Sequence, residues 1–152
     1  MKHLWGALLV LALSAFMPSY LSAQGVSPQT GTARGAAFEL GQNFPNPFNP
    51  ETRIPFTIGD GPGCTDPSRL YRVSLRIYNV LAQSVAVPVL QGGSLNVAGG
   101  ERINRVLLTC NQYTAYWDGT DIRTQQEVAS GVYLYRLEVD GKAVVKKMLV
   151  SK

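Results

Sequence analysis

Short runs in which apolar and polar residues alternate recur along the chain from residue 38 onward. Alternation with a period of two places successive side chains on opposite faces of a strand. Turn residues separate the runs, and no window keeps the 3.6-residue period of an amphipathic helix. The predicted strands cover residues 52–58, 71–78, 85–90, 102–108, 112–117, 132–139 and 143–150. This pattern predicts an all-β fold, an Ig-like antiparallel β-sandwich of about seven strands in two packed sheets.

Prolines and one turn refine this prediction. Pro55 lies in the run 52–58, and because proline has no N–H to donate, we predict that this run is an edge strand. Pro88 interrupts the run 85–90 and weakens it. Asp140-Gly141 joins the last two runs and predicts a β-hairpin with a type I′ turn. The inward face of the first hairpin strand is predicted to carry Tyr133, Tyr135, Leu137 and Val139.

The N-terminal residues follow a different pattern. A basic start at Lys2 precedes an apolar run over residues 4–17, and a polar stretch then ends in Leu21-Ser22-Ala23. This order is typical of a secretory signal peptide over residues 1–23, with cleavage between Ala23 and Gln24. A membrane anchor is the alternative, but the run is shorter than the ~20 residues that span a bilayer, and no other segment is long enough. Residues 24–37 are predicted to be a flexible linker, and residues 38–152 one domain.

Charge and cysteine content narrow the class of protein. The formal net charge is +4, and apart from Lys146-Lys147 the basic residues are scattered, so we predict no nucleic-acid binding. The two cysteines, Cys64 and Cys110, would be buried thiols in a reducing compartment. Export to an oxidising compartment favours a disulfide between them. Closing a loop of this size stabilises a fold by roughly 4 kcal/mol in the chain-entropy model.

The sequence offers little for catalysis. The single histidine, His3, falls in the predicted signal peptide, so no imidazole remains for general-base or metal chemistry. Acidic residues such as Asp118 and Asp140 adjoin glycines, where aspartates usually bond the local backbone. Asp118 and Asp121 could supply oxygens to calcium, but calcium needs six or more oxygen ligands, and a tight turn after Trp117 is favoured. We therefore predict no enzyme activity, cofactor, metal or small-molecule substrate.

One segment has an unusual composition. Residues 40–50 read LGQNFPNPFNP, with three prolines within six residues, which excludes a helix or an interior strand. Asparagines before prolines are driven to extended conformations, and their side chains can form Asx turns. We predict that Phe44 and Phe48 pack against one end of the sandwich; a rigid lead-in to the first strand is the simpler alternative. The motif positions of this segment are Gln42, Asn43, Pro45, Asn46, Pro47, Phe48, Asn49 and Pro50.

Five blocks of the sequence together resemble one known family. They are LGQNFPNPFNPETRIPF (40–56), VSLRIYNVLAQ (73–83), Trp117-Asp118-Gly119 with Asp121, VASGVYLYRL (128–137, with Gly131 and Tyr133) and Lys146-Lys147-Met148-Leu149. In this order they resemble the C-terminal (type A) sorting domain of type IX secretion systems, from residue 38 to 152. The later blocks are also similar to the Ig-like domain of flagellar hook-capping proteins. A hook-cap relative is disfavoured because those proteins lack this signal peptide and the Asn-Pro motif.

The chain departs from the family pattern in three places. Ala82 stands where the family commonly has glycine, and the loop 121–128 lacks its usual glycine. The segments around Cys64 and from residue 102 to 116 are longer than in typical members. Each of these insertions carries one cysteine, so the resemblance suggests that a disulfide joins them.

The resemblance implies export and sorting without chemistry in this chain. The signal peptide would take it through the inner membrane, and the folded domain would dock on an outer-membrane translocon for delivery to the cell surface or medium. In the family a sortase-like peptidase then removes the domain, or the protein is released. Candidate docking residues are Lys146, Lys147, Met148 and Lys152, with the Asn-Pro motif shaping the opposite end. Alternatively, the lysines only protect an edge strand from aggregation.

No larger cargo domain stands between the signal peptide and the predicted sandwich. The chain is therefore interpreted as a sorting module, either of a very small secreted protein or of a truncated gene. The alternative is a free-standing Ig-like module for surface adhesion or structure, in which the cysteine-bearing insertions are the specific part.

Overall fold

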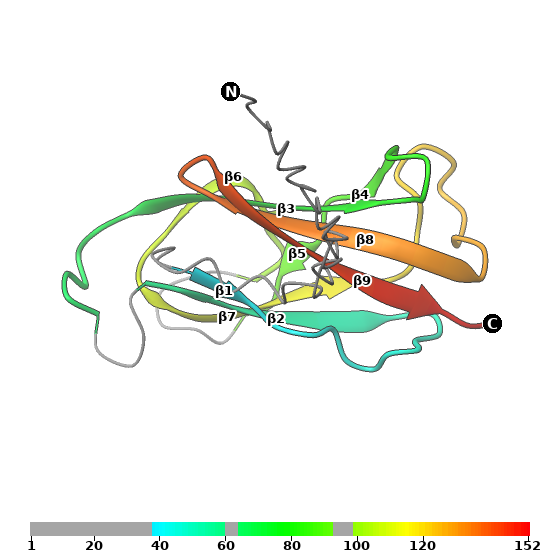
Figure 1. Ribbon diagram of the computed structural model, residues 1–152, viewed down its shortest axis with the longest axis horizontal. Coiled ribbons are helices and arrows are strands. Elements are labelled where there is room, and N and C mark those ends of the chain that lie inside the picture. The colour runs from blue at the N-terminus through cyan, green and yellow to red at the C-terminus, as the bar shows by residue number, and fades with distance from the viewer. Residues whose placement is uncertain (1–37, 60–63, 93–98) are drawn as a thin grey trace, which may run out of the picture.

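The computed structural model describes residues 38–59, 64–92 and 99–152, and this part of the chain forms nine β-strands and no helix. Two antiparallel sheets pack face to face (Figure 1). The first sheet has the order β1-β2-β7-β5, and the second has β4-β3-β8-β9 with β6 also paired to β3. The strands are β1 (Phe38–Leu40), β2 (Thr52–Ile58), β3 (Tyr71–Tyr78), β4 (Ser84–Ala86), β5 (Val89–Leu90), β6 (Asn104–Leu108), β7 (Asn111–Trp117), β8 (Gly131–Val139) and β9 (Lys142–Val150). The predicted β-sandwich is confirmed, with more strands than expected.

The strand order is that of an immunoglobulin fold. Constant-type Ig domains have one sheet in the order A-B-E-D and another in the order C-F-G. Labelling β1, β2, β7 and β5 as A, B, E and D, and β3, β8 and β9 as C, F and G, reproduces both sheets. The hydroxyl of Tyr133, near the start of β8, donates to the carbonyl of Ala129 at 3.0 Å, which is the tyrosine corner of this fold. Strand β6 is additional: it pairs with the first half of β3, and β4 pairs with the end of β3.

The strands with the clearest alternation lie where the pattern placed them. β2 and β3 have the predicted bounds, and β8 and β9 each begin one residue earlier. At the hairpin turn, Asp140 and Gly141 have φ values of 49° and 82°, as a type I′ turn requires. The core between the sheets includes Ile54, Phe56, Ile58, Val73, Leu75, Ile77, Tyr133, Tyr135, Leu137 and Val139.

The prediction that Pro55 marks an edge strand is wrong. β2 lies between β1 and β7, and Pro55 is opposite Thr114 of β7. The carbonyl of Pro55 accepts the N–H of Gly41 at 2.8 Å, on the β1 side. Since the N and C=O of a strand residue point to the same side, the missing N–H of Pro55 also faces that side, where β1 ends at Leu40. An interior strand tolerates this proline because its neighbour is only 3 residues long.

The run 85–90 forms two strands rather than one. β4 pairs with β3 in the second sheet, whereas β5 pairs with β7 in the first. The chain changes sheets at Val87-Pro88, where the proline supplies no ladder donor. The carbonyl of Pro88 accepts the N–H of Ile103 at 2.9 Å, which ties the crossing point to the segment before β6.

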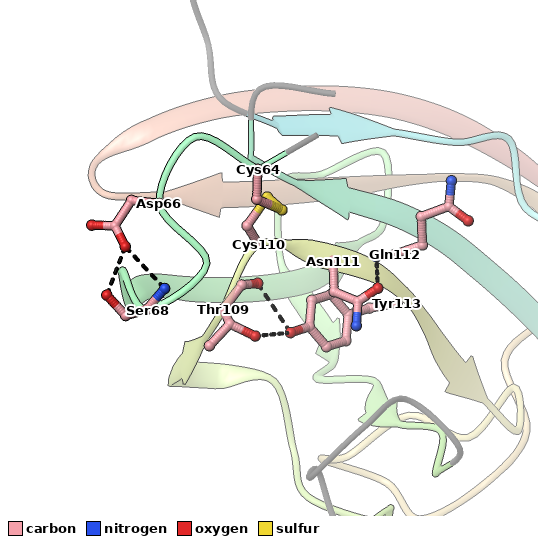
Figure 2. The surroundings of a disulfide bond; sticks show 8 residues. All are labelled: Cys64, Asp66, Ser68, Thr109, Cys110, Asn111, Gln112 and Tyr113. Carbon is pink, nitrogen blue, oxygen red and sulfur yellow. Dashed lines mark hydrogen bonds between the residues drawn. A yellow bond between two sulfur atoms is a disulfide. The ribbon is translucent and has the colours of Figure 1, made fainter. Parts of the chain in front are cut away.

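The predicted disulfide between Cys64 and Cys110 is confirmed, with the two Cα atoms 5.9 Å apart. It joins the loop before β3 to the turn between β6 and β7, so the two longer segments are linked. Figure 2 shows that the hydroxyl of Tyr113 reaches back to Thr109 beside this bond, donating to its carbonyl at 3.0 Å.

The described residues contain no helix long and apolar enough to cross a membrane. The predicted signal peptide, its cleavage site at Ala23-Gln24 and the predicted linker 24–37 lie outside the described residues.

Candidate functional site

Residues 41–50, hereafter the Asn-Pro segment, lie along the free edge of β9. The side-chain oxygen of Asn46 accepts the N–H of Leu149 at 2.9 Å. The N–H of Phe48 donates to the Leu149 carbonyl at 3.0 Å, and the N–H of Ser151 donates to the Phe48 carbonyl at 3.1 Å. In Figure 1 the segment, in cyan, runs beside the end of β9. The Asn-Pro segment therefore adjoins the terminal strand, and the expectation that it lies at the opposite end is wrong.

The side-chain oxygen of Asn46 does not form a local Asx turn, because it bonds a strand far away in sequence. A strand edge carries unpaired N–H and C=O groups that can pair with other chains. The amide group of Gln42 also donates to the Lys147 carbonyl at 3.2 Å. The segment thus occupies the backbone groups of the last part of β9.

Asn43 is the centre of a buried polar cluster that fixes the segment. It is 2% exposed, and its amide nitrogen donates to the Pro45 carbonyl and to the Thr52 hydroxyl, each at 3.0 Å. The Thr52 hydroxyl in turn donates to the Pro45 carbonyl at 3.0 Å. The backbone N–H of Asn43 donates to the Tyr135 hydroxyl at 3.1 Å, and that hydroxyl donates to the Gly41 carbonyl at 2.9 Å. Among the described residues, no buried side-chain nitrogen or oxygen lacks a partner.

Burial raises the pKa of the Tyr135 hydroxyl to about 12. The hydrogen bond from the N–H of Asn43 lowers this pKa, but its effect is smaller than that of burial. Removal from water disfavours the charged phenolate. The hydroxyl therefore keeps its proton and can donate to Gly41 throughout the neutral and mildly alkaline range.

The two phenylalanines of the segment have different environments. Phe48 is 2% exposed, and its ring centroid lies 5.4 Å from that of Trp117, so the prediction that it packs against the sandwich is confirmed. Phe44 is 73% exposed, so the same prediction for it is wrong. The reason is its pairing: Phe44 exchanges two backbone hydrogen bonds of 2.8 Å with Arg53, an outward-facing residue of β2. Paired residues in antiparallel strands point to the same face.

Residues from separate blocks of the resemblance meet around Trp117. Its ring lies between Phe48 of the first block and Tyr133 of the fourth, with the Tyr133 centroid at 6.0 Å. The indole N–H donates to the Thr120 carbonyl at 3.1 Å, which ties the ring to the turn that follows β7. The first, third and fourth blocks therefore share one part of the core.

The turn after Trp117 is as predicted. The carboxylate of Asp118 accepts the N–H of Thr120 at 2.9 Å, which is an Asx turn. Gly119 has a φ of 78°, and a Cβ atom there would overlap the carbonyl oxygen of Pro50. Glycine is therefore required at this position both for its backbone conformation and for the close approach of the Asn-Pro segment.

Asp121 makes an ion pair rather than part of a metal cluster. Its carboxylate lies 2.9 Å from the guanidinium of Arg123, and this hydrogen bond lowers the pKa of Asp121. Within the described ranges, no group of three or more His, Cys, Asp or Glu side chains is placed to hold a metal ion.

The candidate docking residues at the C-terminus point in different directions. Lys146 lies opposite Tyr135 and is half-buried, whereas Lys147 lies opposite Leu134 and is exposed on the outer face of the second sheet. Met148 is 1% exposed and belongs to the core. The ammonium group of Lys152 pairs with Glu127 at 3.0 Å, and its N–H donates to the Ser130 hydroxyl at 3.0 Å. Of the adjacent lysines, only Lys147 is directed at the solvent.

The turn that departs from the family pattern is well formed. Ala82 has a φ of 58°, a left-handed conformation that glycine adopts more easily. The side-chain oxygen of Asn79 accepts the N–H groups of Leu81 and Gln83, each at 3.0 Å. This bonding holds the turn in its conformation despite the alanine.

Two residues of the buried cluster, Thr52 and Tyr135, were not predicted as part of it. Both lie on inward faces of alternating strands, Thr52 in register with Ile54 and Phe56. A polar group at an inward position needs a hydrogen-bond partner, and the amide of Asn43 was the available candidate nearby in sequence. An inward polar residue therefore predicts that a hydrogen-bond partner exists. It does not identify Gly41 and Asn43 as the residues whose backbone groups bond Tyr135.

No known protein family matches the chain, and no curated protein matches it either.

Proposed function

We propose that this chain is a non-catalytic sorting domain of the type IX secretion class, which directs an exported protein across the outer membrane to the cell surface or medium. The observation that best supports the proposal is the bonding of the Asn-Pro segment to β9, through Asn46 and Phe48. The first and last blocks of the resemblance are distant in sequence yet form one unit. A carrier that recognises this unit recognises only a folded domain, because the two blocks meet only after folding.

The polar residues of the blocks favour a structural role for the motif rather than a reaction. The side chain of Asn43 bonds Pro45 and Thr52, that of Asn46 bonds Leu149, and that of Asp118 bonds Thr120. Side chains that bond the backbone in this way stabilise the fold and are not free to take part in a reaction. The proposed partners are therefore proteins of the secretion pathway: an outer-membrane translocon and, after passage, a sortase-like peptidase.

The proposal is tested by expressing the full chain in a cell that has a type IX system and in the same cell without its outer-membrane translocon. We expect the mature chain, beginning at Gln24, at the surface or in the medium of the first cell and in the periplasm of the second. Equal delivery in both cells would refute the sorting role and favour a free-standing surface module.

A truncated variant tests the role of the C-terminus without unfolding the domain. Removing the last ten residues would take away most of β9, including Met148 and Val150 of the core, so loss of delivery would not be informative. Removing only Ser151 and Lys152 leaves β9 complete. We expect reduced delivery with little change in melting temperature; full delivery would argue against recognition through the C-terminus.

A further inference from the structure

The outer faces of the two sheets differ. Antiparallel sheets that face water usually carry polar residues on the solvated side. The outward positions of β2 and β7 follow this rule except at Pro55, and the others are Arg53, Thr57, Gln112, Thr114 and Tyr116. The outward positions of β8 and β9 instead carry four exposed aliphatic residues, which together are called the aliphatic patch. They are Val132 (44% exposed), Leu134 (37%), Val145 (50%) and Leu149 (41%).

Strand register places Val132, Leu134 and Leu149 side by side, and Val145 lies diagonally beyond them, opposite Arg136. Val132 lies directly opposite Leu149, and Leu134 lies opposite Lys147 on one side and Tyr78 of β3 on the other. Residues opposite each other on one face have Cβ atoms about 5 Å apart. The patch therefore crosses the strands of one flat face, and contiguous apolar surface of this kind marks a site of interaction.

A pair of arginines adjoins the patch. Arg76 of β3 lies directly opposite Arg136 of β8, and like charges in this position are unfavourable in an isolated sheet. The guanidinium of Arg136 pairs with Glu138 at 2.5 Å, whereas that of Arg76 donates to the uncharged amide oxygen of Asn104 at 3.1 Å. Among the described residues Glu138 neutralises Arg136 and Arg76 makes no ion pair, so the two arginines together keep one positive charge that no carboxylate balances.

We infer that the aliphatic patch and the Arg76–Arg136 pair form a docking surface for another protein. The partner supplies a carboxylate to the two guanidinium groups and apolar side chains to the patch. An apolar centre with arginine beside it is the composition of protein interfaces, and arginine binds carboxylates through two parallel hydrogen bonds. Lys147, the exposed member of the terminal lysine pair, lies in the same surface opposite Leu134.

Two other occupants fit less well. A second copy that docks through the same face would bring the same two arginines and a Glu138 already paired with Arg136, so it would not balance the charge of the pair. A lipid surface requires apolar side chains that enter ~5–10 Å below the headgroups. The patch residues are at most half exposed on a flat sheet, with Arg136 and Lys147 directly beside them, so they do not protrude in this way.

The location of the partner rests on the proposed function, which places it in the outer membrane. The test measures binding of the purified mature chain to outer membranes isolated from the producing cells. The same membranes are used after surface proteolysis, and vesicles made only from their extracted lipids serve as the protein-free probe. The variant is Arg76→Glu, and the matched control is Arg53→Glu, an exposed arginine on the outer face of the first sheet.

We expect Arg76→Glu to weaken binding at least about tenfold, since removing one partner of a buried interfacial charge pair leaves the other charge unpaired. Arg53→Glu should bind like the wild type. Both variants should remain folded, and Arg76→Glu should melt no lower than the wild type because it replaces a like-charge pair with Arg136 by an opposite-charge pair. Binding should be lost on proteolysed membranes and on lipid vesicles. Equal binding to lipid vesicles, wild-type binding by Arg76→Glu, or no membrane binding at all would each overturn the inference. Because delivery in cells is measured separately, translocon-dependent delivery would still support the sorting role if this inference failed.

Discussion

Replacing Tyr135 with phenylalanine removes one oxygen atom from the point where the Asn-Pro segment is attached to the core. That hydroxyl donates to the Gly41 carbonyl at 2.9 Å and accepts the N–H of Asn43 at 3.1 Å. The ring itself is fully buried and keeps its packing, so the change isolates the two hydrogen bonds. The prediction therefore concerns how strongly this one group holds the segment in place.

The expected loss follows from the two bonds. Each intramolecular hydrogen bond contributes about 1 kcal/mol net, and a buried N–H left without a partner adds a desolvation penalty of about 1 kcal/mol or more. Asn43 is 2% exposed, so its N–H has little access to water. We therefore expect Tyr135→Phe to lower the free energy of unfolding by about 2 to 3 kcal/mol. For a domain of this size, this corresponds to a melting temperature lower by about 10 °C.

Urea unfolding followed by tryptophan fluorescence measures the loss, and amide hydrogen exchange locates it. Exchange should accelerate at the N–H of Asn43, and at that of Leu149, which Asn46 holds. The control is Tyr71→Phe: Tyr71 is 5% exposed, but its hydroxyl makes no hydrogen bond to the described residues, so a change below about 0.5 kcal/mol is expected. If Tyr135→Phe were as stable as the control, with Asn43 still protected, the hydroxyl would not be what holds the segment.

Further predictions concern pH, a turn and the disulfide. Folding raises the pKa of Tyr135 from 10.0 to about 12, so this contribution to stability is complete below pH 10. As the pH rises from 10 to 12 the free energy of unfolding should fall by about 2 kcal/mol, which urea titrations at alkaline pH would measure. The Tyr135→Phe variant should not show this pH-dependent fall. Ala82→Gly should raise the free energy of unfolding by about 0.5 kcal/mol because φ is 58° there, whereas Ala115→Gly, in the interior of β7, should lower it by about 1 kcal/mol. Reducing the Cys64–Cys110 bond should lower it by up to about 4 kcal/mol; an unchanged urea midpoint would contradict the chain-entropy argument.

The parts of the fold that sequence alone predicted are those where one local rule dominates. Alternation fixed the inward faces of β2, β3 and β8, because a shift of one residue would expose every core side chain. Asp140-Gly141 predicted its turn because few residue pairs adopt two successive positive φ values. In each case the residues that determine the structure are adjacent in sequence.

The errors arose where the outcome depends on a distant neighbour. Whether Pro55 lies on an edge depends on how far β1 extends, and a 3-residue strand leaves too weak a pattern to detect. Nothing in the sequence of residues 85–90 indicates that its two halves belong to different sheets. Phe44 and Phe48 each stand between an asparagine and a proline, in opposite order, and nothing in that local sequence indicates that one pairs with Arg53 on the outside while the other packs on Trp117. The candidate site shares this property, since Asn46 meets Leu149 only in the folded chain.

The arrangement around β9 explains how the last residues of this chain remain ordered. Terminal residues usually fray because nothing holds their backbone. Here Phe48 bonds Ser151, and Ser130 bonds Lys152, so hydrogen bonds continue past the last strand residue, Val150. The same segment occupies the last part of the edge of β9, which would otherwise pair with other chains. What remains accessible in the terminal strand is its outer face, with Val145, Lys147 and Leu149 beside the arginine pair. If the Asn-Pro segment holds the edge closed, a partner must approach through that face, which is where the aliphatic patch lies.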